Sequence, residues 1–232
     1  MEIGGIQKFS MSDYPGNLSA ILFTIGCNFC CPYCHNPELV LPDQYVEPID
    51  LDKIFAFLKD RLGQLDGVVI TGGEPTLHSD LPQFVQKIRN MGYVVKLDTN
   101  GTHPEMLQKL IEEKLVNYIA MDYKSPAYKY SKIVGLEQNE NIDLDIQKIK
   151  NSLEILKNTS IEYEIRTTIV KKYLDNDDIV QIRREVGEVQ HHYFQEFNPE
   201  KTLDPELGED EYNIENVKEM EEFQKESNVS FR

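Results

Sequence analysis

Short apolar runs rich in β-branched residues alternate with helical patterns along most of the chain. The apolar runs predict six strands, at 19–25, 67–71, 93–98, 117–122, 161–170 and 191–197. Apolar residues that recur at three- and four-residue spacing predict helices between them, at 50–62, 80–91, 103–115, 141–158 and 175–187. In the helix at 80–91, for example, Leu81, Phe84 and Ile88 lie on one face.

This alternation is typical of βα units. Six strands joined by five helices with short connections predict an α/β protein with a six-unit parallel β/α fold. The periodicity leaves open whether the sheet is an open, doubly wound sheet or a partly closed barrel. In both arrangements ligands bind at the carboxyl ends of the strands. The motifs that directly follow the predicted strands are therefore the candidate site residues.

Composition and charge narrow the classes of partner. The 232 residues are 40% hydrophobic and 28% charged, as in a globular protein, and 24 Lys+Arg against 40 Asp+Glu give a net charge of −16. Such a charge attracts neither nucleic acid nor an anionic membrane surface, so we expect neither as a partner. No apolar run approaches the about 20 residues of a membrane span. The N-terminus lacks the basic start and apolar stretch of a signal peptide, so we expect a cytoplasmic protein.

All four cysteines, Cys27, Cys30, Cys31 and Cys34, lie in the segment CNFCCPYC. Disulfides that stabilise a fold are spread along a chain, so this grouping indicates metal or redox chemistry instead. Two C-x2-C pairs could hold zinc, although zinc sites separate their pairs by roughly a dozen or more residues, and one pair could be redox active. Alternatively, Cys27, Cys31 and Cys34 could hold three irons of a [4Fe–4S] cluster, with the fourth iron open and Cys30 outside the site.

The sequence around the cysteines resembles a known family. CNFCCPYCHNP, followed by GGEP at 72–75, is similar to the motifs of the radical S-adenosylmethionine superfamily. GIQKFSMSDYPG ahead of the cysteines resembles activating enzymes of glycyl-radical enzymes, nearest to the type that activates anaerobic ribonucleoside-triphosphate reductase. The resemblance covers roughly residues 3–200. It implies a partial (β/α)6 barrel, a [4Fe–4S] cluster on Cys27, Cys31 and Cys34, and S-adenosylmethionine as the second cofactor.

The resemblance also assigns cofactor contacts to residues in the cysteine segment and just after the predicted strands. These are Tyr33, Asn36, Gly72, Gly73, Glu74, Asp98, Thr99, Asp122, Lys124 and Arg166. Taken without the resemblance, GGEP and the DTNG segment at 98–101 are ordinary glycine-containing turns, and the D-x-K segment at 122–124 is an exposed ion pair. In some relatives a monovalent cation lies near the DTNG segment, which makes such a cation a further candidate cofactor.

The resemblance implies radical chemistry on a partner enzyme. A reduced cluster would cleave S-adenosylmethionine to methionine and a 5′-deoxyadenosyl radical, which would take a hydrogen atom from a glycine of the partner. The partner would be a glycyl-radical enzyme, with anaerobic ribonucleotide reductase as the first candidate, and the electron donor a flavodoxin or ferredoxin. Two other classes compete: a small-molecule radical enzyme similar to 7-carboxy-7-deazaguanine synthase, and an electron-transfer or sensing protein. The DYPG and D-x-K segments favour the activating enzyme.

The C-terminal segment differs in composition from the rest of the chain. Residues 200–226 hold eleven acidic residues against three lysines, and a weak helical pattern runs over 212–226. A run of like charge of this kind is typical of a solvated surface. We therefore expect a radical S-adenosylmethionine domain with an N-terminal extension over 1–199, and an acidic loop and helix over 200–232 packed on the same domain.

Overall fold

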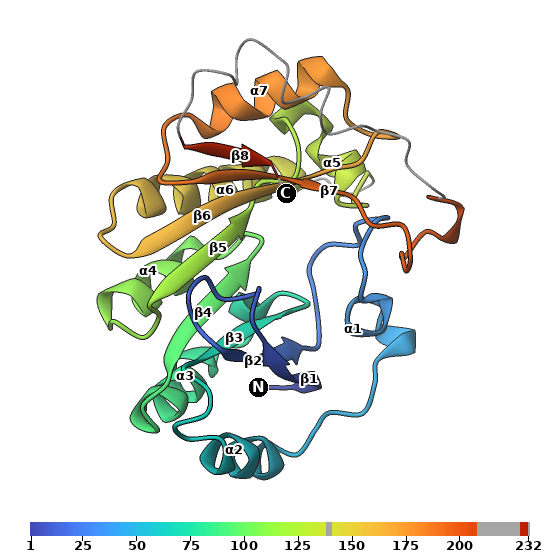
Figure 1. Ribbon diagram of the computed structural model, residues 1–232. Coiled ribbons are helices and arrows are strands. Elements are labelled where there is room, and N and C mark those ends of the chain that lie inside the picture. The colour runs from blue at the N-terminus through green and yellow to red at the C-terminus, as the bar shows by residue number, and fades with distance from the viewer. Residues whose placement is uncertain (138–140, 208–227, 232) are drawn as a thin grey trace.

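The fold is built on one curved sheet (Figure 1). The structure, a computed structural model, describes residues 1–137, 141–207 and 228–231. In these residues the sheet has eight strands: β1 (Ile3–Ser10), β2 (Ser19–Thr24), β3 (Gly67–Gly72), β4 (Val94–Thr99), β5 (Tyr118–Asp122), β6 (Glu162–Ile169), β7 (His192–Glu196) and β8 (Val229–Phe231). β1 is antiparallel to β2, and every later pair of neighbours is parallel.

Helices connect the parallel strands. They are α1 (Pro37–Val40), α2 (Leu51–Asp60), α3 (Leu81–Asn90), α4 (Pro104–Glu112), α5 (Tyr130–Ile133), α6 (Ile142–Lys157) and α7 (Asn176–Val186). The longer helices α2, α3, α4, α6 and α7 lie along the outer side of the sheet (Figure 1). The six strands and five helices predicted from periodicity are present, with small shifts at their ends. β1, β8, α1 and α5 are additions that the sequence analysis missed.

The order of the strands answers the question that periodicity left open. In a doubly wound sheet the strand order reverses at a switch point. Here the order follows the chain from β1 to β8, and these two strands are the edges of the sheet in the described part of the chain. A sheet that curves in one direction without reversal is a partly closed barrel. The predicted partial (β/α)6 barrel is therefore confirmed, with one extra strand on each side.

The two faces of the strands carry different residues because side chains alternate along a strand. On β3, Val68 and Ile70 point outward into the main hydrophobic core under the helices. Val69 points inward, where it packs in a separate cluster with Ile21 and Tyr118. This apolar layer fills the part of the interior next to the amino ends of the strands. Above it, toward the carboxyl ends, the inward-facing positions become polar.

The C-terminal part of the chain is described only in pieces. The helix expected over 212–226 lies outside the described residues. Before that segment, Leu203 N donates a hydrogen bond to Cys34 O at 2.9 Å, and Asp204 N donates to Pro32 O at 2.8 Å. The chain after β7 therefore passes over the cysteine segment. No helix in the described ranges is long and apolar enough to cross a membrane.

Lowering the pH below 6.5 is expected to destabilise the fold through His192, which is fully buried on β7. Thr167 Oγ1 donates to Tyr123 O, so His192 Nε2 donates to Thr167 Oγ1, and the buried Nδ1 has no partner. A second proton would have no acceptor, and burial, assisted by the Arg183 charge, lowers the pKa of His192 to about 3. The unfolded chain binds that proton near pH 6.5 and the folded chain does not, so stability falls as the pH falls through this range.

The loss between pH 6.5 and 5 is about 1.6 kcal/mol, because the slope rises from half of about 1.4 kcal/mol per pH unit at pH 6.5 to nearly the full value at pH 5. Urea unfolding at a series of pH values measures it. His192→Gln is expected to flatten this pH dependence, whereas His191→Gln, at the exposed neighbouring position, is expected to keep it. An identical pH slope in wild type and His192→Gln would contradict the prediction.

Candidate active site

A cavity of about 370 Å³ opens at the carboxyl ends of the parallel strands. Its walls are formed by the cysteine segment after β2 and by residues at the ends of β3, β4, β5, β6 and β7. Thirteen lining residues are those assigned to the cluster or to S-adenosylmethionine in the sequence analysis: Cys27, Cys31, Tyr33, Cys34, Asn36, Gly72, Gly73, Glu74, Asp98, Thr99, Asp122, Lys124 and Arg166. Cys30 does not line the cavity. The fold thus brings these thirteen residues, up to 139 positions apart in sequence, to one site.

The three lining cysteines are neutral thiols in the absence of a metal. Burial is the largest effect on each, and it raises the pKa of Cys31 to about 11 and raises the pKa values of Cys27 and Cys34. The nearby Lys124 ammonium acts in the opposite direction on all three. A bound metal cluster would deprotonate them, because a coordinating thiol loses its proton outright. Buried thiols beside a cation are suited to holding an anionic metal–thiolate centre.

Cys30 is held through its backbone rather than placed in the cavity. Its N–H donates to Val134 O at 2.9 Å. The residue after Val134, Gly135, has φ +71°, and a Cβ on it would lie 2.2 Å from Cys30 O. Only glycine permits both the left-handed backbone and this close approach. The loop after α5 therefore positions the middle of the cysteine segment from a distant part of the chain.

Gly135→Ala is expected to lower the amount of cluster that the protein can hold, because the added methyl group must displace the backbone at Cys30. Iron and sulfide content after anaerobic reconstitution measures the effect, and we expect at least a halving, since a methyl group 2.2 Å from a carbonyl oxygen is not tolerated without a shift. Gly63→Ala is the matched control: Gly63 has φ +75°, and a Cβ added there would have no heavy atom within 4 Å. Equal iron content in the two variants would show that the contact does not matter.

The GGEP turn packs against the segment that leads to Cys27. Gly73 N donates to Thr24 O at 2.9 Å, and Glu74 N donates to Gly26 O at 2.7 Å. A Cβ on Gly73 would lie 2.0 Å from Gly26 O. The glycines are thus required for a close approach between two backbones as well as for the space at the cavity wall. The GGEP turn and the segment that leads to Cys27 are therefore held against each other before any ligand binds.

The Glu74 carboxylate is fully used by protein donors. It is 1% exposed and accepts hydrogen bonds from Thr99 Oγ1 at 2.8 Å, Asn100 N at 2.6 Å and Thr76 N at 3.0 Å. Burial raises the pKa of Glu74, and these hydrogen bonds oppose the rise. Its side chain therefore ties the GGEP turn to the DTNG turn.

A pair of asparagines extends this connection to the cysteine segment. Asn100 Nδ2 donates to Asn28 Oδ1 at 2.9 Å, and Asn28 Nδ2 donates to Thr102 Oγ1 at 3.1 Å. Asn28 follows Cys27 directly, so the first cysteine is linked to the DTNG turn by side-chain hydrogen bonds. Neither contact could be predicted from the sequence, because nothing in the local pattern pairs residues 28 and 100.

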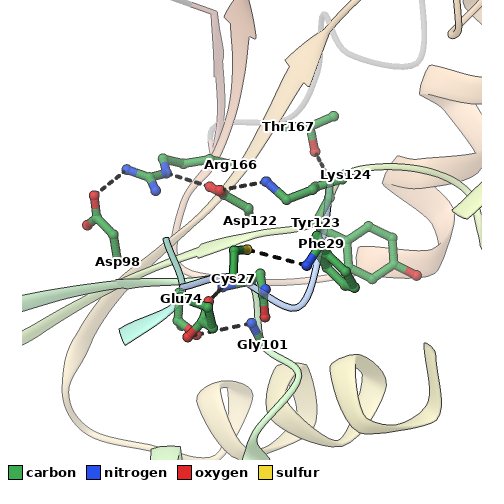
Figure 2. Close-up of polar contacts among 12 residues, drawn as sticks. Cys27, Phe29, Glu74, Asp98, Gly101, Asp122, Tyr123, Lys124, Arg166 and Thr167 are labelled. Carbon is green, nitrogen blue, oxygen red and sulfur yellow. Dashed lines mark hydrogen bonds and ion pairs between the residues drawn. The ribbon is translucent and has the colours of Figure 1, made fainter. Parts of the chain in front are cut away.

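A chain of alternating charges runs along the cavity, and Figure 2 shows its part from Lys124 through Asp122 and Arg166 to Asp98. Lys124 Nζ lies 3.0 Å from Asp122 Oδ2, and Arg166 Nε lies 2.9 Å from Asp122 Oδ1. Arg166 Nη1 lies 3.1 Å from Asp98 Oδ2, and Lys96 Nζ lies 2.7 Å from Asp98 Oδ1. The residues of the predicted D-x-K segment are therefore part of a network across β4, β5 and β6, not an exposed ion pair.

The network keeps both of its carboxylates ionised. Burial alone would raise their pKa values, but the charges of Arg166 and Lys124 outweigh it at Asp122, and those of Arg166 and Lys96 outweigh it at Asp98. The pKa values of both aspartates are consequently below their usual range. A fixed set of charges of this kind can bind a zwitterionic ligand group without rearranging first.

The residues present fit a [4Fe–4S] cluster and S-adenosylmethionine. Three thiols line the cavity, which is the donor set for a cube with one open iron. Within the described residues, no three His, Cys, Asp or Glu side chains are grouped to hold a single metal ion, and a cube instead takes each thiolate on a separate iron. Tyr33 Oη is buried beside them without a hydrogen-bond partner, and a polar ligand atom in the cavity would satisfy it.

Several lining residues were not predicted. Thr168, Gln195 and Glu196 complete the wall at β6 and β7. His35 also lines the cavity, and its Nε2 lies 2.9 Å from Asn198 O. This contact holds the His35 imidazole against the chain that follows β7. Thr168 lies two residues after Arg166, so strand alternation was a usable signal for it.

Comparison with known protein families identifies the superfamily to which this chain belongs. The sequence profile of the radical SAM superfamily matches residues 21–186, which is more than half of the chain. The chain therefore belongs to the radical SAM superfamily and is an enzyme of this superfamily. Membership implies a [4Fe–4S] cluster and S-adenosylmethionine, the groups that the cavity fits.

Individual proteins are similar to this chain in sequence or in structure. A protein of Methanocaldococcus jannaschii, provisionally named a glycyl-radical enzyme activating enzyme, is 38% identical over 212 residues, covering 88% of this chain and 83% of the relative. A provisionally named GTP 3′,8-cyclase of Pyrococcus horikoshii is 27% identical, covering 73% of this chain but 52% of its own length. The solved structure of anSMEcpe with bound AdoMet has a TM-score of 0.62 at 19% identity, covering 90% of this chain and 61% of the other. This last likeness supports the fold.

Proposed function

We propose that this protein is an activating enzyme that generates a glycyl radical on a partner enzyme, with an anaerobic ribonucleotide reductase as the first candidate partner. The observation that carries the proposal is that all thirteen residues assigned from motifs line one cavity. The provisional name of the Methanocaldococcus jannaschii relative, which aligns with 88% of the chain, supports the choice of partner class.

In this proposal each group of lining residues has its own task. Cys27, Cys31 and Cys34 hold the cluster, and Cys30 stays outside its coordination. When bound, the reduced cluster supplies the electron that splits S-adenosylmethionine into methionine and a 5′-deoxyadenosyl radical, which takes a hydrogen atom from a glycine α-carbon and becomes 5′-deoxyadenosine. A flavodoxin or ferredoxin would reduce the cluster.

The remaining residues orient S-adenosylmethionine. The main chain of Gly72, Gly73 and Glu74 faces its methionine amino group, and the cations Arg166 and Lys124 attract its carboxylate. Asp98 and Asp122 fix the directions of those cations, because each cation is hydrogen bonded to an aspartate before the ligand arrives.

The other lining residues complete the site. Thr99 lies at the end of the site that binds the methionine carboxylate of S-adenosylmethionine. Tyr33 and Asn36 offer hydrogen bonds to the ligand from the cysteine segment. The apolar side chains of Phe29 and Val40 on the cavity wall help to exclude water. A radical formed inside is thereby protected from side reactions until the glycine of the partner enters.

The experiment that tests the proposal uses the reduced, cluster-loaded protein, S-adenosylmethionine and a candidate ribonucleotide reductase, mixed without oxygen. Electron paramagnetic resonance is expected to show a glycyl radical on the reductase. The partner with its radical-bearing glycine changed to alanine, and the Cys31→Ala variant of this protein, are the controls and are expected to give no signal.

A second candidate function is radical chemistry on a small molecule. The observation in its favour is the alignment with a provisionally named GTP 3′,8-cyclase over 73% of this chain. That relative is about twice as long as the aligned region. Formation of 5′-deoxyadenosine with no glycyl radical on any glycyl-radical enzyme of the source organism, together with turnover of a nucleotide, would favour this second candidate.

A further inference from the structure

Lys96 is a buried lysine beneath the cavity that no motif identifies. It lies on β4, is 2% exposed, and does not line the cavity. Its Nζ lies 2.7 Å from Asp98 Oδ1 and 5.9 Å from the centre of the Tyr118 ring. Tyr118 Oη in turn donates to the buried Glu164 at 2.9 Å. The ammonium thus sits between the polar floor of the cavity and the layer below it.

With Lys96 in this position, both carboxylate oxygens of Asp98 and of Asp122 are paired with cations. Asp98 Oδ1 faces Lys96 and Asp98 Oδ2 faces Arg166. Asp122 Oδ1 faces Arg166 and Asp122 Oδ2 faces Lys124. Every carboxylate oxygen of the pair therefore has a side-chain cation within 3.1 Å. A monovalent metal ion at Asp98 would lie close to the Lys96 and Arg166 charges and be repelled by both.

We infer that Lys96 is a positioning residue whose ammonium takes the place of a monovalent metal ion beside Asp98, so that S-adenosylmethionine binds without K⁺ or Na⁺. The inference rests on the proposed assignment of the cavity to S-adenosylmethionine and not on the identity of the partner enzyme. It replaces the monovalent cation that the family resemblance suggested with a group built into this chain.

The physical reason is the cost of an unpaired buried charge. Removing one partner of a buried ion pair leaves the other uncompensated, which is strongly unfavourable. Without Lys96, Asp98 would be paired with Arg166 alone. Arg166 would then be held less firmly in its orientation toward Asp122 and the ligand. A small cation from solution could enter the space that the lysine leaves and restore the arrangement.

The test is anaerobic titration calorimetry of S-adenosylmethionine into the cluster-loaded protein, in KCl, NaCl or choline chloride at equal ionic strength. The wild type is expected to bind with the same affinity in all three salts. Lys96→Gln is expected to bind at least about tenfold more weakly in choline chloride, a loss of about 1.4 kcal/mol, since Arg166 would be held less well toward the ligand. In KCl or NaCl, its affinity is expected to recover toward that of the wild type.

Two variants separate this role from general damage. Lys96→Arg keeps the charge and is expected to bind S-adenosylmethionine without added cations. Lys129→Gln removes a different lysine that pairs with a buried carboxylate, Asp178, away from the cavity. It is expected to lower stability without producing any dependence on K⁺ or Na⁺.

The outcomes that overturn the inference are distinct from those that overturn the proposed function. If the wild type binds S-adenosylmethionine only with K⁺ or Na⁺, or if Lys96→Gln binds like the wild type in choline chloride, Lys96 does not replace a cation. If Lys96→Gln fails to fold, binding of S-adenosylmethionine by the wild type only with K⁺ or Na⁺ would still overturn the inference. If the wild type binds no S-adenosylmethionine in any salt, the assignment of the cavity itself is wrong.

Discussion

Alanine at Cys27, Cys31 or Cys34 is expected to abolish the visible absorbance of a reconstituted [4Fe–4S] cluster, whereas alanine at Cys30 is expected to leave it. Each of the three lining thiols would bind a separate iron, so the loss of any one leaves two protein ligands for the cube. Cys30 is held by its backbone at Val134 and Gly135, outside the cavity. We expect iron and sulfide content to fall by at least about tenfold at the three positions, because metal binding is coupled to the complete ligand set.

The Cys30→Ala variant serves as the matched control, because it removes a thiol from the same segment. Absorbance, iron content and sulfide content are measured for all four variants after anaerobic reconstitution. Loss of the cluster from Cys30→Ala, or a normal cluster in any of the other three, would contradict the assignment of ligands.

Asp122→Asn is expected to weaken S-adenosylmethionine binding by about tenfold or more and to lower the free energy of unfolding by about 1–3 kcal/mol. Asp122 compensates two partly buried cations, Lys124 at 3.0 Å and Arg166 at 2.9 Å. Removing one charge of a partly buried pair leaves its partners without their acceptor, and about 1.4 kcal/mol corresponds to tenfold in affinity. Denaturant unfolding and titration calorimetry of the cluster-loaded protein measure the two effects.

Asp178→Asn is the control for Asp122→Asn. Asp178 is 1% exposed and pairs with Lys129 and Tyr128, and it does not line the cavity. We expect its loss to lower stability while leaving S-adenosylmethionine affinity near that of the wild type. Wild-type affinity in Asp122→Asn would exclude a role for the ion-pair chain in binding.

The sequence was sufficient to predict strands β2 to β7 and the longer helices, because their apolar residues follow a regular period. β1 was missed because its sequence, IGGIQKFS, contains two adjacent glycines and three consecutive exposed residues, so no alternation is visible. β8 is three residues long and is defined only by its pairing with β7, which is far away in sequence. Strands of this kind depend on tertiary contacts that a local pattern does not contain.

The same limit applies to the candidate site. Residues in motifs at strand ends, such as Glu74 and Asp98, could be named because parallel strands present their carboxyl ends on one face. Lys96 could have been named as well, since it stands two residues before Asp98 and therefore on the same face of β4. The pairing of Asn28 with Asn100 could not, because it depends on how the cysteine segment lies across the DTNG turn.

Local motifs also do not indicate all the contacts that a side chain makes. The GGEP motif suggests a contact between Glu74 and S-adenosylmethionine, but it does not reveal that the Glu74 carboxylate accepts hydrogen bonds from Thr76, Thr99 and Asn100. The Asp122 and Lys124 side chains belong to a network completed by Arg166 from β6, 42 or more positions further along the chain. A motif therefore located the site, and the tertiary structure determined what each side chain does there.

Formation of 5′-deoxyadenosine from S-adenosylmethionine tests the central claim most directly. The cluster-loaded protein is incubated with S-adenosylmethionine without oxygen, with and without a low-potential reductant, and the products are separated and quantified. We predict 5′-deoxyadenosine and methionine only from the reduced protein, and none after exposure to air or from Cys31→Ala. Cleavage that persists after the cluster is lost, or no cleavage by the reduced, cluster-loaded protein, would contradict the account.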